Sequence, residues 1–326
     1  MCRRKKLSLV VVCATIVFLT LVWIVPAHSQ VKYPTRAVTI IVPYPPGGAT
    51  DVINRLIATF LSKKWGVPVN VVNKSGGMTV PATLELYQSP PDGYTMYGDS
   101  TNTIMLNVSV KNLPFDIMDR TFVSVVTSSS MALAVNPKSP LRSVKDVVEE
   151  IRKNPENVSW ATFGGSGVGD LVQRKFFKVA GVDYSKTRPV MITSGAQTAQ
   201  LLAGGHITMG FLAMASGAAP IRGGLVKPLA IASAKRDPSF PDIPTMGEQG
   251  YPGLLQDHWE GISGPPNLPA HIVSAWEQAL QEFLNDPQMA PKIGTALEKP
   301  NYLNAADFKE FVKKQMEEVK QLWAVK

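Results

Sequence analysis

Short β-branched runs alternate with amphipathic segments along the chain. Residues 37–44 form an apolar, β-branched run of the kind that is buried in a parallel sheet. From Asp51 to Trp65 apolar residues recur at helical spacing, and residues 69–72 form the next short apolar run. This order of strand, turn, helix and strand predicts α/β architecture with parallel strands.

The same alternation continues toward the C-terminus. The patterns predict further strands at residues 94–98, 122–126, 131–135 and 158–163. Ser143 and Asp146 have the spacing of a capping box, which predicts a helix from there to about Lys153. Amphipathic patterns predict further helices at residues 170–180, 270–284 and 306–323, the first of them ended by Gly181.

The N-terminus has the pattern of an export signal. A cationic cluster at residues 3–6 precedes an apolar run at residues 7–25, and Ala27 and Ser29 have the spacing that a signal peptidase reads. We therefore expect residues 1–29 to be a signal peptide. The apolar run is also long enough to cross a bilayer, so an uncleaved N-terminal anchor is the alternative.

Charge and cysteine content narrow the classes of function. Cleavage of the signal would remove four basic residues and lower the net charge from +8 to +4, with no dense basic stripe. This argues against a nucleic-acid partner and is compatible with an anionic ligand. Both cysteines fall inside the signal, and no histidine has a partner at metal spacing. We therefore expect no disulfide, no metal and no cofactor.

A glycine-rich turn follows the first predicted strand. Its two glycines let backbone N–H groups point outward, and the start of the next helix adds a partial positive charge, so the turn suits an anion. A plain tight turn is the alternative. Asp51 is better explained as a first-turn acid than as a catalytic carboxylate. The candidate ligand-binding residues here are Pro46, Gly47, Gly48, Ala49, Thr50 and Asp51.

A second glycine-rich turn follows residues 158–163. A nucleophile elbow around Ser166 would need a glycine where Val168 stands, and a dinucleotide fingerprint would need one where Asp170 stands. What remains is a set of exposed N–H groups and a hydroxyl at a helix start, suited to a carboxylate. The candidates here are Phe163, Gly164, Gly165, Ser166 and Gly167.

Two more polar segments, around residues 99–103 and 194–198, repeat this placement. Each alone is typical of an ordinary polar loop. Their recurrence after successive strands is informative, because ligands of open α/β sheets bind beyond the carboxyl ends of the strands. The candidates are Ser100, Thr101, Asn102, Ser194, Gly195 and Gln197.

Several motifs then resemble one family over nearly the whole chain beyond the signal. They are residues 33–36, the strand and turn at residues 42–51, Pro91-Asp92-Gly93-Tyr94-Thr95, Leu202-Ala203-Gly204-Gly205, residues 230–236 and residues 241–245. In this order they resemble the substrate-binding proteins of tripartite tricarboxylate transporters, also called the Bug family.

The resemblance implies a two-lobed α/β fold like that of type II periplasmic binding proteins, with hinge-linked lobes and a central cleft. Residues 30–128 with 225–326 would form the first lobe and residues 129–224 the second. It implies an exported monomer in the periplasm or on the outer face of the cytoplasmic membrane. The expected partners are a small carboxylate, di- or tricarboxylate-like, and a two-component membrane permease.

The resemblance also implies which residues line the cleft. Both glycine-rich turns would hold one carboxylate, and Ser128, Ala213 and Met214 join the candidates. The chain has Ile192-Thr193-Ser194 where relatives often carry Tyr-Lys-Gly, and Leu212 where they often carry Asp. Leu212 removes a group that could meet an amino or hydroxyl substituent, which favours a plainer acid over an amino acid such as aspartate.

Two other functions stay open at this stage. A secreted serine hydrolase using Ser166 lacks the elbow spacing and an evident histidine partner, so no catalytic residue is expected. A ligand-sensing protein anchored by residues 7–25 would need the same cleft as a transport protein.

Overall fold

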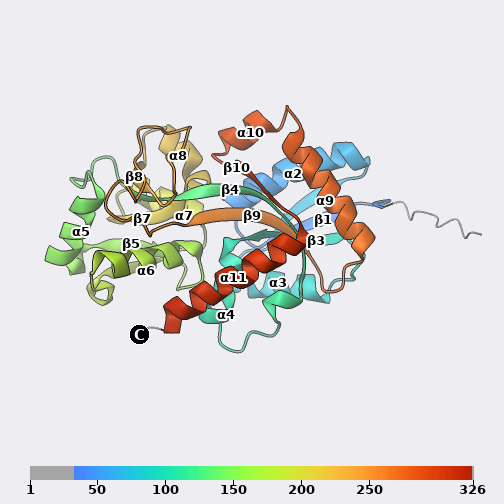
Figure 1. The fold of residues 1–326 in the computed structure, drawn as a ribbon, viewed down its shortest axis with the longest axis horizontal. Helices are drawn as coiled ribbons and strands as arrows, with labels where there is room; N and C mark the ends of the chain where they lie inside the picture. The colour runs from blue at the N-terminus through green and yellow to red at the C-terminus, as the bar shows by residue number, and fades with distance from the viewer. Residues whose placement is uncertain (1–32, 325–326) are drawn as a thin grey trace, which may run out of the picture. The chain divides into compact units, whose positions relative to one another are not determined.

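A computed structural model describes residues 33–324, shown in Figure 1. The predicted signal peptide, residues 1–29, and both cysteines lie outside the described residues. From Pro34 onward the chain forms one compact unit. Within residues 33–324, no helix is both long enough and apolar enough to cross a membrane.

The first lobe is built on a mixed sheet. Its parallel strands are β1 (Val38–Val42), β2 (Val69–Asn73) and β3 (Thr95–Ser100), with β1 in the middle. Antiparallel strands extend the sheet from β3 in the order β9 (Asp257–Gly264), β4 (Thr121–Val135) and β10 (Lys299–Leu303). The predicted strands at residues 37–44, 69–72 and 94–98 are confirmed. Val38, Ile40 and Ile41 are fully buried, as expected for a central parallel strand.

Helices cover this sheet. The longest are α2 (Ala49–Trp65), α9 (Ala270–Asn285) and α11 (Ala305–Ala324); the shorter ones are α3 (Val80–Gln88), α4 (Leu106–Ser109) and α10 (Ala290–Thr295). Ile53, Ile57 and Leu61 bury one face of α2. Helices α2 and α9 meet through Trp65 and Trp276, whose rings pack edge-to-face at 4.9 Å between centroids. The three long helices predicted in this part of the chain are confirmed.

Strand β4 joins the two lobes. The sequence predicts two strands at residues 122–126 and 131–135, but the structure has one strand through both. Residues 127–130 (Thr-Ser-Ser-Ser) break the apolar pattern, yet they are buried between β9 and β10. β4 pairs with β9 as far as Ser130 and with β7 and β8 from Met131 onward. One continuous strand therefore belongs to the sheets of both lobes.

The second lobe surrounds the end of β4. Its strands are β5 (Ser159–Thr162), β6 (Arg188–Met191), β7 (Gly210–Ala213) and β8 (Lys227–Ile231), and its helices are α5 (Val144–Lys153), α6 (Val168–Ala180), α7 (Gly195–Ala203) and α8 (Ala218–Arg222). The predicted capping box of α5 is present, because Ser143 and Asp146 each bond the other's backbone N–H. Gly181 ends α6 with a left-handed φ of 61°.

Residues after Gly224 remain with the second lobe for longer than the sequence suggested. β8 pairs with β4 at Leu133 and Ala134. Leu229, Met246 and Leu254 share one buried cluster with side chains of α5 and α6. The sequence predicted that the chain returns to the first lobe at residue 225, but these contacts keep residues 227–254 with the second lobe. The chain rejoins the first-lobe sheet in β9, which begins at Asp257.

Candidate ligand-binding cleft

The first glycine-rich turn is closed by an acid of the helix that follows it. Gly47 has a φ of 88°, a left-handed conformation that favours glycine, and its N–H donates to Asp51 Oδ2 at 2.9 Å. Asp51 also accepts from Arg55 Nε at 3.0 Å and from Asn73 Nδ2 at 2.8 Å. Burial opposes ionisation of Asp51, but these hydrogen bonds outweigh it and lower the pKa of this carboxyl. Asp51 therefore holds the turn, in agreement with its reading as a first-turn acid.

The second turn uses the same device more completely. Asp170, three residues into the helix region, accepts the backbone N–H groups of Phe163, Gly165 and Gly167 at 3.0–3.2 Å. It also accepts the Thr162 hydroxyl at 2.5 Å. Burial outweighs these bonds and raises the pKa of Asp170. The expectation that these N–H groups are exposed to a ligand is wrong, because the carboxylate of Asp170 occupies them.

The turn before α7 is likewise self-contained. Ser194 caps the helix by accepting the N–H of Gln197 at 3.2 Å. The Gln197 side chain accepts the N–H of Thr193 at 2.9 Å. Gly195 is the first residue of α7. A Cβ on Gly195 would lie 2.7 Å from Ser216 Oγ. Glycine therefore lets the N-terminus of α7 approach the 3-10 turn η6 (Met214–Gly217) closely.

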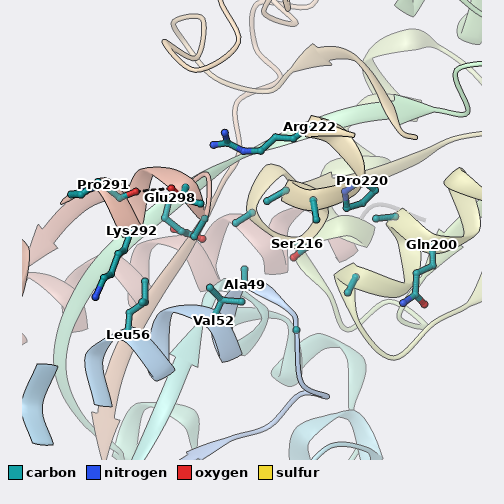
Figure 2. Close-up of a pocket in the computed structure, with 18 residues that line it drawn as sticks. Ala49, Val52, Leu56, Gln200, Ser216, Pro220, Arg222, Pro291, Lys292 and Glu298 are labelled. Carbon is teal, nitrogen blue, oxygen red and sulfur yellow. Dashed lines mark hydrogen bonds between the residues drawn. The ribbon is translucent and has the colours of Figure 1, made fainter. Parts of the chain in front are cut away.

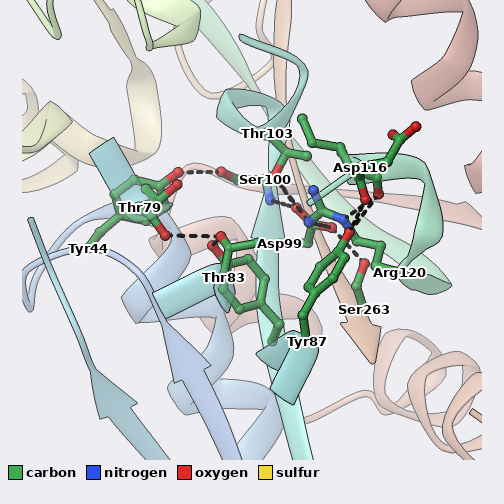
Figure 3. Close-up of polar contacts among 12 residues, drawn as sticks. Tyr44, Thr79, Thr83, Tyr87, Asp99, Ser100, Thr103, Asp116, Arg120 and Ser263 are labelled. Atoms are coloured by element: carbon green, nitrogen blue, oxygen red, sulfur yellow. Dashed lines mark hydrogen bonds and ion pairs between the residues drawn. The ribbon is translucent and has the colours of Figure 1, made fainter. Parts of the chain in front are cut away.

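The polar segment that begins at the end of β3 is mostly buried, and Figure 3 shows the contacts around Asp99 and Ser100. Asp99 is fully buried and accepts from Arg120 Nη1 at 2.8 Å and from Ser263 Oγ at 2.6 Å. Ser100 lies 3.3 Å from the Tyr44 hydroxyl, and Thr101 accepts the backbone N–H of Trp259 at 2.7 Å. Because Arg120 is engaged with Asp99 inside the first lobe, it does not reach the space between the lobes.

Asn102 is the member of that segment that faces the second lobe. Its Oδ1 accepts the N–H of Val168, at the start of α6, at 2.7 Å. Ser109 of α4 donates to the Gly165 carbonyl at 2.5 Å. Arg222 of α8 donates to the Gly294 carbonyl in α10 at 3.1 Å. These three hydrogen bonds join the lobes directly.

A small chamber lies between the lobes, at the N-termini of α6 and α7. Its volume is about 30 Å³, room for about two water molecules. Its polar side chains are Asn102, Thr198, Ser216 and His258; the rest of its wall is Met131, Phe163, Val168, Gly169, Gly195, Phe211, Leu212 and Ala213. Two helix N-termini and a histidine thus surround a space of carboxylate size.

A second cavity of about 180 Å³ adjoins this chamber, because Asn102 and Phe163 line both. Tyr44 and Thr79 of the first lobe and Ser166, Ile192 and Thr193 of the second also line it. The hydroxyl of Ser166 donates to the Phe163 carbonyl at 2.8 Å, so it is not held by a base. The two adjacent spaces could hold a carboxylate group and a small organic body.

A larger cavity of about 700 Å³, shown in Figure 2, also adjoins the small chamber, because Ser216 lines both. Ala49, Val52 and Leu56 of α2 line one wall, and Ser216 and Pro220 of the second lobe line another. Its lining is mainly alanine, proline and aliphatic side chains. Its polar and charged side chains are Gln200, Ser216, Arg222, Lys292, Thr295 and Glu298, so this cavity could accommodate an apolar body beside a polar or charged group.

The sequence reasoning did not single out His258, which is buried in β9 at the small chamber. Its Nε2 lies 3.0 Å from Glu260 Oε1, which also accepts from the Thr50 hydroxyl at 3.2 Å. Glu260 is fully buried, and this burial raises the pKa of its carboxyl. The signal available in the sequence was that His258 and Glu260 are two residues apart, because residues at that spacing on a strand share one face. No histidine has a partner at metal spacing in the sequence, and no three metal-binding side chains cluster within the described residues.

The structure brings some predicted residues to these cavities and not others. Asn102, Phe163, Ser166, Gly195 and Ala213 line the small chamber or its neighbour, and Gly47 and Ala49 line the large cavity. Gly164 and Gly165 line a separate cavity within the second lobe. Pro46, Gly48, Thr50, Asp51, Ser100, Thr101, Ser128, Gly167, Ser194, Gln197 and Met214 line none of these spaces. A ligand-binding role for this last group stays a prediction.

Comparisons with known proteins agree on one family. Residues 53–324 match the family described as the tripartite tricarboxylate transporter family receptor. The chain is 29% identical to protein BugT of Bordetella pertussis over 276 residues, which is 82% of each protein. It is 26% identical to a UPF0065 protein of the same organism over 291 residues, 89% of each.

Solved structures show the same fold. A periplasmic transporter is 30% identical with a TM-score of 0.82, covering 87% of this chain and 95% of that one. The R. palustris protein Rpa4515, solved with adipate, is 26% identical with a TM-score of 0.84, covering 89% and 97%. The periplasmic binding protein BugD is 25% identical with a TM-score of 0.82, covering 90% and 99%.

These matches confirm the predicted two-lobed α/β fold of a periplasmic binding protein. They also confirm that the protein is not an enzyme, because the family and its solved members are solute-binding proteins. The chain belongs to the tripartite tricarboxylate transporter receptor family and is a solute-binding protein.

Proposed function

We propose that this protein captures a small organic carboxylate between its lobes, outside the cytoplasmic membrane. It delivers that acid to the two-component membrane permease of a tripartite tricarboxylate-type transporter. The observation that carries the proposal is the small chamber, where the N-termini of α6 and α7 meet the buried His258. Several of the first N–H groups of these helices are already bonded to Asp170, Asn102 and Ser194, so it is the partial positive charge of the two helix dipoles that favours an anion here.

The size and lining of the space support a carboxylate over other anions. The chamber accommodates a group the size of two waters, and its neighbour of about 180 Å³ has room for a short organic body. Rpa4515, a relative at 26% identity, was solved with adipate. A sulfate or phosphate alone would leave the second cavity unfilled.

Leu212 narrows the class of acid. Its side chain is 2% exposed and lines the small chamber beside Phe211. A buried aliphatic wall cannot hydrogen-bond an amino or hydroxyl substituent, and a polar group left unpaired there loses binding energy. The preferred acid therefore carries no polar substituent next to the bound carboxylate.

Hinge closure would give this site its affinity. Asn102 and Ser109 of the first lobe already bond the backbone of the second at the edge of the cleft. When the lobes meet over the acid, water leaves the chamber and the local dielectric falls, which strengthens each hydrogen bond to the carboxylate.

A thermal-shift screen followed by calorimetric titration tests the proposal. Acetate, benzoate, adipate, malate and aspartate form the panel, with glucose and lysine as controls of other charge. We expect one-to-one binding of at least one unsubstituted acid, and weaker binding of aspartate. Binding of lysine or glucose with no acid would refute a carboxylate-binding function, and tight aspartate binding alone would refute the role given to Leu212.

A further inference from the structure

The large cavity is built by both lobes and is largely separate from the small chamber. Its walls come from α2 and α10 of the first lobe and from α7, η6 and α8 of the second. Of its described lining residues, only Ser216 also lines the small chamber. Its volume of about 700 Å³ lies within the range of about 300–1,000 Å³ that is typical of small-molecule sites. A cavity of this size is not needed for the proposed function.

The longer walls of this cavity are apolar. Ala49, Val52 and Leu56 lie at successive turns of α2, and the rise of the helix from the first to the last is about 10 Å. Val52 and Leu56 are half-buried. The second lobe contributes small apolar side chains, which are Ala196, Ala199, Ala218, Ala219 and Pro220. An apolar body in this cavity would therefore be removed from water by both lobes.

A guanidinium lies where the two lobes meet at this cavity. Arg222, the last residue of α8, extends toward α10 (Figure 2) and donates from Nη2 to the Gly294 carbonyl at 3.1 Å. A guanidinium carries five N–H groups, so this bond leaves others free to donate to an oxygen anion. Arg222 has no ion-pair partner among the described residues. Lys292 of α10 adds a second positive charge to the lining.

The acid in the lining does not cancel this charge. Glu298, which directly precedes β10, is 3% exposed. Burial raises the pKa of Glu298 well above its ordinary value, and the nearby Glu260 raises it further, so the neutral acid is favoured. The cavity therefore combines apolar walls with a net positive charge on its α10 side.

We propose that the large cavity is a second binding site, which takes an amphipathic organic anion. The carboxylate of this molecule accepts hydrogen bonds from Arg222, and its apolar body lies along α2 and α7. A medium-chain monocarboxylic acid such as octanoate has both features. The inference goes beyond the proposed function, because it requires no ligand in the small chamber.

Calorimetric titration of the purified protein with octanoate tests the second site. The titration is made alone and with saturating adipate, which fills the small chamber if the proposed function is right. We expect octanoate to bind in both titrations. Hexanoate should bind about tenfold more weakly, because two fewer methylene groups are buried. Octylamine, which has the same chain and the opposite charge, should bind about tenfold more weakly or not at all, because it cannot accept from Arg222.

Arg222→Gln removes the charge and keeps an amide donor. We expect its affinity for octanoate to fall about tenfold, because a charge-assisted hydrogen bond is lost. Arg152→Gln is the matched control, because Arg152 is also exposed and donates to a backbone carbonyl, that of Ala180 at 2.7 Å, but lines none of the cavities described above. Ala219→Phe, at an exposed position of α8, should weaken octanoate binding by narrowing the cavity.

Several results would overturn the inference. They are no binding of octanoate, its complete displacement by adipate, octylamine binding as tightly as octanoate, or octanoate binding that neither Arg222→Gln nor Ala219→Phe weakens. Octanoate binding that depends on Arg222, with no binding of any acid to the small chamber, would instead refute the proposed function and leave the second site standing.

Discussion

The two glycine-rich turns share one construction but differ in their surroundings. In each, an acid in the first turn of the helix reaches back to the preceding loop: Asp51 to Gly47, and Asp170 to Phe163, Gly165 and Gly167. Asp51 also pairs with the half-exposed Arg55, whereas Asp170 is 1% exposed and has no cationic partner within the described residues. The same residue pattern therefore gives a charge-paired turn in one lobe and a buried carboxylate nest in the other.

This difference shows that a glycine-rich turn before a helix is not by itself an anion site. Its N–H groups can be consumed by the protein's own carboxylate, as Asp170 consumes them here. The ligand-binding space lies instead beside the second turn, where Gly169 and Gly195 bring two helix starts to the chamber. The second turn positions α6 and does not contact the ligand with these N–H groups.

Replacing Asp170 should have the largest effect on stability. Asp170→Asn places an amide N–H₂ against the N–H groups of Gly165 and Gly167, so we expect a loss of about 3 kcal/mol of unfolding free energy. Urea denaturation measures it. Asp146→Asn, at the same helix position in the exposed α5 cap, is the control and should change stability little. Equal losses in the two variants would show that Asp170 acts only as a helix cap.

Replacing Asp51 should cost less. Asp51→Asn keeps an acceptor for Gly47 but removes the charge that Arg55 and Asn73 bond, so we expect a loss of about 1 kcal/mol. The same urea titration measures it. A loss as large as that of Asp170→Asn would mean that the two turns contribute equally, and that the partly exposed Arg55 matters more than its exposure suggests.

Alanine in the two turns tests backbone strain alone. Gly47 and Gly165 have φ values of 88° and 93°, and a Cβ on either would meet nothing within 4 Å. Gly47→Ala and Gly165→Ala should therefore each cost about 1 kcal/mol, from the left-handed conformation only. Gly48→Ala is the control, because Gly48 has a φ of −79°. A clearly larger loss at either position would indicate a contact beyond the strain.

The pH dependence of the two carboxyls should have opposite signs. Folding lowers the pKa of Asp51, so its contribution to stability is present above the ordinary value of 3.8 and is lost as the pH falls below it. Folding raises the pKa of Asp170, so its ionisation reduces stability as the pH rises from 3.8 to the higher folded pKa. Thermal melts between pH 3 and 6 give the slope of melting temperature against pH. Relative to the wild type, Asp51→Asn and Asp170→Asn should change this slope in opposite directions. Changes in the same direction would contradict this assignment.

The regular parts of the fold were predictable because their apolar periodicity is complete. β1 and α2 carry uninterrupted patterns, and the capping box of α5 is a local signal that needs no tertiary information. β9 was missed because its buried positions include His258, Glu260 and Ser263, which read as polar. Their burial depends on the neighbouring strands β3 and β4, which the local sequence does not reveal.

The candidate site was predictable in place but not in chemistry. The sequence located the loops around Asn102, Phe163 and Gly195 at the strand ends, and all three line the small chamber. It could not show that Asp170 fills the second turn, because that depends on the exact direction of N–H groups. Nor could it bring His258, far along the chain, to the same chamber as Asn102.

A crystal structure of the protein with adipate, or with the acid of the panel that binds most tightly, tests the central claim most directly. We expect one carboxylate in the small chamber, within hydrogen-bonding distance of Ser216 Oγ, and the organic body in the cavity beside Tyr44 and Ile192. An acid bound outside the space between the lobes, or held by the N–H groups of Gly165 and Gly167 in place of Asp170, would contradict it.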